Sequence, residues 1–141
     1  MTRDKVLTKE LKKRWMIIHT FGLCADINPR VSVKAIEKAK EFLEADSGAC
    51  LWDRTIIYLG YIGSLSKEYA RQIFPVLEKA LIKVPGQTKT ILESFERMTV
   101  VEDDEINRKI LEYALEYMNY SKSSVRSKAS KIQRFLTENK R

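Results

Sequence analysis

The residues that could serve as nucleophiles, bases or metal ligands are few in this chain. Its single histidine, His19, lies near an apolar stripe, and no nearby serine or cysteine suggests itself as a nucleophile for it to activate. Cys24 and Cys50 with one histidine are too few soft ligands for a zinc site, and we expect both to be buried free thiols. The acids at 102–105 lack the EF-hand spacing, and no glycine-rich phosphate loop occurs. We therefore predict no catalytic, cofactor or metal site, and no enzyme.

Tyrosines are the first candidates for binding. Tyr113, Tyr117 and Tyr120 follow one another at spacings of four and three, which places them on one face of a helix. Tyrosine combines a large apolar area with a polar tip and is common at interfaces. We predict a protein-binding or self-association patch here if the stripe is exposed. The alternative is that these rings form a half-buried part of the core.

Basic residues gather at both ends of the chain, whose net charge is +7. Residues 1–14 carry six basic and two acidic side chains, Lys12 and Lys13 among them, and residues 121–141 carry seven and one. The last expected helix spreads four cations over the side opposite its apolar residues: Lys122, Arg126, Lys131 and Arg134. Such a face could neutralise the phosphates of a nucleic acid without reading its sequence. The alternative is that these cations keep the end faces of the fold in water.

Composition indicates a globular all-α protein. Hydrophobic residues make up 44% of the 141 residues and charged residues 32%, whereas glycine and proline are too few for a loop-rich β protein. No apolar run approaches the roughly 20 residues of a membrane span, and the N-terminus lacks the apolar segment of a signal peptide. We expect a single cytoplasmic domain without membrane contact.

Apolar residues recur at helical spacing throughout and predict seven helices. Breakers such as the Asp-Ile-Asn-Pro-Arg stretch at 26–30, the Asp-Ser-Gly stretch at 46–48 and the Pro-Gly pair at 85–86 separate them. The expected helices cover about 4–25, 32–45, 49–63, 66–83, 87–100, 103–120 and 123–138.

Alternate helices align with one another at a nearly constant spacing. Two apolar columns with steps of 36 to 38 residues run through the odd-numbered helices: Phe21, Leu59, Phe95 and Ile132, and Cys24, Ile62, Met98 and Phe135. The even-numbered helices return the same period separately, at Ile36, Phe74 and Leu111. We therefore predict that a helix pair recurs about every 37 residues, and we expect Phe135 in the core. A hairpin that cannot bury its own apolar stripe stacks on its neighbours. A non-repetitive helical bundle is the alternative.

The repeat resembles the HEAT family. The Leu-Gly-Tyr-Ile-Gly segment at 59–63 resembles the end of a HEAT second helix, and Ile-Phe-Pro-Val-Leu at 73–77 resembles a first helix with its proline. Where the first hairpin has Gly60, the next two have Glu96 and Gln133. The resemblance implies an α-α superhelix, armadillo-like in its packing, with hairpins at 31–63, 66–100 and 103–138 and a capping helix within 1–25.

HEAT proteins are mostly scaffolds, so the resemblance implies a non-enzymatic module that binds a protein partner along its second helices. Nucleic-acid binding through the basic ends is the alternative, and self-association is also open. A third possibility is an enzyme acting on DNA bases, because HEAT-like DNA glycosylases use Trp, Asp and Arg on a concave surface. Trp52, Asp53 and Arg54 offer these residue types, although neighbours in a helix point in different directions.

Overall fold

The computed structural model describes residues 33–44 and 48–138, which contain six α-helices and no β-strand. The helices are α3 (Ile36–Glu44), α4 (Ala49–Gly63), α5 (Lys67–Lys83), α6 (Thr88–Met98), α7 (Asp104–Tyr117) and α8 (Ser123–Glu138). Short 3-10 turns are η1 (Val33–Ala35), η2 (Pro85–Gln87) and η3 (Thr99–Val101). The all-α prediction is confirmed. The first expected helix, with Lys12, Lys13 and His19, lies outside the described residues, as does Cys24.

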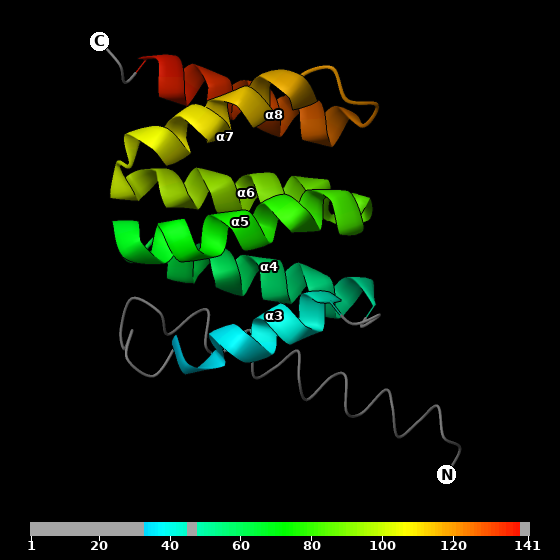
Figure 1. The fold of residues 1–141 in the computed structure, drawn as a ribbon. Coiled ribbons are helices and arrows are strands. Elements are labelled where there is room, and N and C mark those ends of the chain that lie inside the picture. Colours follow the sequence, from blue (N-terminus) through cyan, green and yellow to red (C-terminus); the bar gives the residue numbers. More distant parts are fainter. Residues whose placement is uncertain (1–32, 45–47, 139–141) are drawn as a thin grey trace.

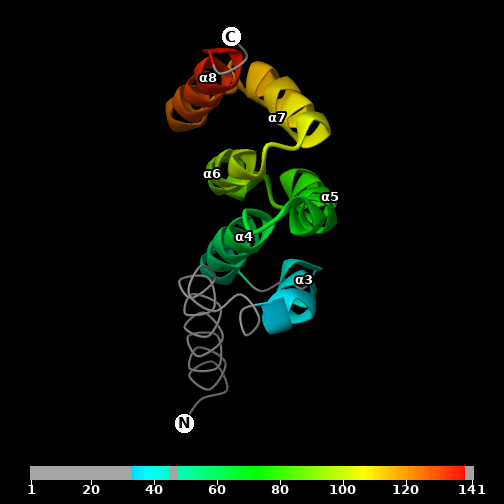
Figure 2. The same cartoon turned by 90° about the vertical axis from the view of Figure 1, so that its left-hand side faces the viewer.

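The six helices form two layers (Figures 1 and 2). Figure 2 shows α3, α5 and α7 on one side and α4, α6 and α8 on the other. Consecutive helices pack as antiparallel neighbours, and within the second layer α4 packs on α6 and α6 on α8. Each hairpin therefore covers the apolar side of the next, as helices with one apolar stripe must.

Side chains that the sequence places just before two helices cap them. Ser66 Oγ accepts the backbone N–H of Tyr69, 3.1 Å away, at the start of α5. Asp103 Oδ1 accepts the N–H groups of Glu105 and Ile106 at the start of α7, both at 3.1 Å. Each cap satisfies donors that a helix leaves free in its first turn.

The core runs along the seam between the two layers. Leu59, Phe95 and Ile132, three members of one sequence column, are fully buried in α4, α6 and α8. The rings of Phe74 and Phe95 lie 4.8 Å apart between centroids and join α5 to α6. Burying such large side chains contributes about 1.5–3 kcal/mol each, so this seam supplies much of the stability of the stack.

Two glycines allow α4 and α6 to approach closely. A Cβ atom added to Gly60 would lie 2.6 Å from Ser94 Oγ, and one added to Gly63 would lie 2.9 Å from Met98 Sδ. The close approach also lets Ser94 Oγ donate to the backbone oxygen of Ile56, at 2.9 Å. The backbones of α4 and α6 therefore approach each other closely at these two glycines.

Candidate binding surfaces

The tyrosine stripe of α7 lies against neighbouring helices. The Tyr113 hydroxyl donates to Glu78 Oε2 of α5 at 2.6 Å, and its ring lies 5.6 Å from that of Phe95. Tyr117 and Tyr120 pack edge to face at 5.3 Å. Burial, followed by the nearby Glu78 carboxylate, raises the pKa of Tyr113. All three rings are half-buried, so they pack the chain internally, and their role in protein binding stays a prediction.

The four predicted cations, Lys122 just before α8 and the other three on it, all reach solvent but differ in their contacts. Arg126 Nη1 donates to the backbone oxygens of Tyr120 and Ser121, at 2.8 and 2.9 Å, and so closes the turn before its own helix. Lys122, Lys131 and Arg134 are exposed and form no ion pair with a described residue. The polyanion-binding prediction for them stays a prediction.

The Trp52, Asp53 and Arg54 cluster is half-buried on α4. Trp52 packs against the core, and Asp53 Oδ1 accepts the hydroxyl of Thr90 on α6 at 2.6 Å. Asp53 therefore links two neighbouring helices of one layer.

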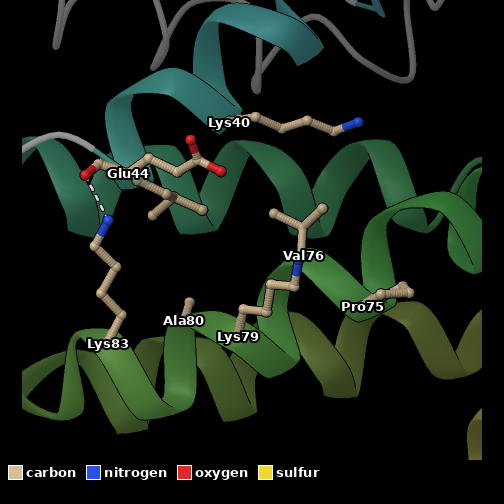
Figure 3. Close-up of a pocket in the computed structure, with 8 residues that line it drawn as sticks. Lys40, Glu44, Pro75, Val76, Lys79, Ala80 and Lys83 are labelled. Carbon is tan, nitrogen blue, oxygen red and sulfur yellow. Dashed lines mark hydrogen bonds between the residues drawn. The ribbon is translucent and has the colours of Figure 1, made fainter.

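A pocket of about 570 Å³, which sequence reasoning missed, opens between α3 and α5 (Figure 3). Its lining residues are Lys40, Leu43, Glu44, Pro75, Val76, Lys79, Ala80 and Lys83. Two of its three lysines are already engaged within the chain. Lys40 pairs with Glu37 at 3.2 Å, and Lys83 Nζ donates to the backbone oxygen of Glu44. The Glu44 carboxylate lies over the same opening, so the pocket presents mixed charge and favours no one ligand.

A second cavity, of about 590 Å³, is lined by residues of η3, of the start of α7 and of the end of α8. In Figure 1 the start of α7 and the end of α8 lie at the same edge of the stack. We call this cavity the α6–α8 groove; it is lined by Thr99, Val100, Glu102, Asp104, Asn107, Phe135 and Leu136. Val100 is 68% exposed and Phe135 46%. The prediction that Phe135 belongs to the core is therefore wrong.

Met98 and Phe135, which share one sequence column, differ in what they pack against. Met98 packs over Gly63 of α4, whereas the residue that aligns with Gly63 in the next hairpin is Thr99 of η3, which lines the groove with Phe135. Glu96 aligns with Gly60 in the same way, and it pairs with Lys128 of α8 at 3.3 Å. The glycine over which Met98 is buried therefore has no counterpart beneath Phe135.

Comparison with known proteins adds no family: no protein-family model, no curated protein and no solved structure matches this chain. Among the helices of residues 33–44 and 48–138, none has both the length and the apolar character needed to cross a bilayer. No three His, Cys, Asp or Glu side chains of these residues come together as metal ligands would. Cys50 is exposed, so the expectation that it is buried is wrong, because it lies in the first turn of α4, away from the seam.

Proposed function

We propose that this protein is a non-enzymatic helical-repeat module of the HEAT kind, which binds a protein partner through the α6–α8 groove. The observation that carries the proposal is the exposure of Val100 and Phe135 on the two sides of one cavity. Single exposed apolar residues are ordinary on protein surfaces. Two that meet in one groove mark a contact site, because water is expelled from both when a partner binds.

The repeat interpretation is supported by the separation along the chain of the residues that join α4 to α6. Thr90 bonds Asp53 across 37 residues, and Ser94 bonds the backbone of Ile56 across 38. These distances along the chain match the spacing of the apolar columns. In a stack built of similar hairpins, each hairpin contacts its neighbours in this way.

The groove is also suited to binding because α7 and α8 supply four of its lining residues, while Val100 lies on the short turn η3. Phe135 is near the end of a 16-residue helix, and Asn107 lies in the first turns of a 14-residue helix. Sites on regular elements keep their geometry better than sites on loops, and a preformed site loses less entropy on binding. The volume of about 590 Å³ is in the range of sites that take small molecules or peptide side chains.

Site-specific photocross-linking tests the proposal directly. A benzophenone amino acid placed at Phe135 or Val100, in cells that naturally express the chain, should yield one discrete protein adduct. The same probe at Ile82, which is 86% exposed on α5, is the matched control and should not yield it. Adducts that are absent from both groove positions, or that form equally at all three positions, would contradict the proposal.

Nucleic-acid binding is the second candidate, and it is favoured by the exposure of Lys131 and Arg134 on α8 and of Lys122 just before it. Fluorescence anisotropy with a generic duplex and a single strand, over a series of salt concentrations, tests it. Binding that weakens with salt and is lost in a Lys131→Glu/Arg134→Glu variant would support this function. No binding at low salt would end it.

A further inference from the structure

We infer that the α6–α8 groove receives a basic, apolar peptide segment: an apolar side chain of the partner sits between Val100 and Phe135, and a neighbouring lysine or arginine faces Glu102 and Asp104. The inference rests on the proposed function and names the class of partner. Two features of the groove carry it: its apolar sides and the two carboxylates at its rim.

The apolar part of the ligand follows from the sides of the groove. Val100 comes from η3 and Phe135 from α8, and Leu136 lies buried beside Phe135. An aliphatic or aromatic side chain placed between them would cover both exposed surfaces at once. The free energy of burial is proportional to the apolar area that is removed from water, so the groove favours such a side chain over a polar one.

The charge of the ligand follows from the α6–α7 turn. Glu102 and Asp104 line the groove and form no ion pair with a described residue, whereas Asp103 between them is buried and holds Arg71 at 2.8 Å. Glu102 has φ 55°, and it is the one non-glycine residue with positive φ among those that the structure describes. Glycine would adopt this conformation without strain. Position 102 therefore carries a carboxylate at the groove although its backbone conformation would suit glycine better.

The cations on α8 give the bound segment a direction. Arg134 precedes Phe135, and Lys131 lies one helical turn earlier, but neither lines the groove. A basic ligand residue is repelled from that side and attracted to the α6–α7 turn. The apolar residue of the partner therefore lies toward α8 and its basic residue toward Glu102 and Asp104.

Selection from a phage-displayed library of random dodecapeptides on the full chain tests the inference. Enriched sequences should place Leu, Ile, Met or Phe within a few positions of Lys or Arg. A synthetic peptide from the selection should bind at least tenfold more weakly to Phe135→Ser, and to Glu102→Gln/Asp104→Asn. It should bind equally well to the matched controls Ile82→Ser and Glu116→Gln, which change exposed residues outside the groove. Far-UV circular dichroism of each variant confirms that it is folded.

The other outcomes would contradict either the basic character of the ligand or the groove as its binding site. Peptides that depend on Phe135 but are acidic, or that ignore Glu102→Gln/Asp104→Asn, overturn the basic ligand and leave the proposed function intact. Peptides that bind Phe135→Ser as tightly as the natural chain remove the groove itself as the site. A dimer of the chain that Phe135→Ser disperses would make a second copy the occupant, and would also overturn the inference.

Discussion

Replacing Gly60 by alanine tests whether the close packing of α4 on α6 requires a residue without a side chain. The added Cβ would lie 2.6 and 2.7 Å from Ser94 Oγ and Cβ and 3.0 Å from its Cα. Because one of these atoms is backbone, the two helices must separate rather than one side chain rotate. Overpacking of this kind costs about 1–3 kcal/mol, and losing the Ser94 bond to Ile56 costs about 1 kcal/mol. Alanine is also a better helix former than glycine, which offsets about 1 kcal/mol of this loss in stability. We expect a net loss of about 2–3 kcal/mol at the upper end of the overpacking range.

Urea unfolding followed by far-UV circular dichroism measures this loss, and Gly63→Ala is its matched control. There the three atoms nearest to the new Cβ all belong to the flexible side chain of Met98, at 2.9–3.0 Å, and none is backbone, so we expect a change of at most about 1 kcal/mol. In a Ser94→Gly background, which removes both close side-chain atoms, Gly60→Ala should also cost less than about 1 kcal/mol. Ser94→Ala keeps the 2.7 Å Cβ contact and should not rescue. Equal losses at both glycines, or no coupling to Ser94, would refute the close-approach argument.

Three further predictions concern stability and pH. Asp103→Ala should lose about 2 kcal/mol in urea unfolding because α7 loses its cap, whereas Asp103→Asn should lose less because asparagine also caps helices. Hydrogen bonding from the Ile106 N–H, and then Arg71, lowers the pKa of Asp103. The ionised Asp103 carboxylate therefore stabilises the folded chain fully above the unfolded carboxyl pKa of about 4, and this stabilisation is lost as the pH falls toward the lower pKa of the folded state. The stability of Asp103→Asn in acid should lack this part of the pH dependence. Glu102→Gly should raise the unfolding free energy by about 0.5–1 kcal/mol by relieving the strained φ, and an unchanged or lower value would contradict the strain. Burial raises the pKa of Tyr58 and Tyr113, so stability should fall as the pH rises above about 10, by up to about 1.4 kcal/mol per pH unit for each tyrosine; denaturant titrations at alkaline pH check this, and a flat profile would contradict it.

The contacts at the binding surfaces could be predicted from the sequence only in part. The tyrosine spacing correctly places Tyr113 and Tyr117 on α7, whereas Tyr120 lies beyond the end of that helix. The bond of Tyr113 to Glu78 joins residues 35 apart and depends on how α5 and α7 are stacked. The pocket between α3 and α5 could not be predicted from the sequence for the same reason, because its sides come from different hairpins. The α6–α8 groove likewise depends on how η3, α7 and α8 come together, which no short stretch of the sequence specifies.

By itself the sequence determined the helices, because apolar periodicity, capping residues and breakers act over a few neighbouring positions. It also determined which stripe of each helix turns inward, as the buried Leu59, Phe95 and Ile132 illustrate. Only the tertiary structure decided how closely each pair of helices approaches. That distance depends on the side chains of both partners at once, so Met98 is buried over a glycine while Phe135, which aligns with it in the sequence column, stays exposed beside Thr99.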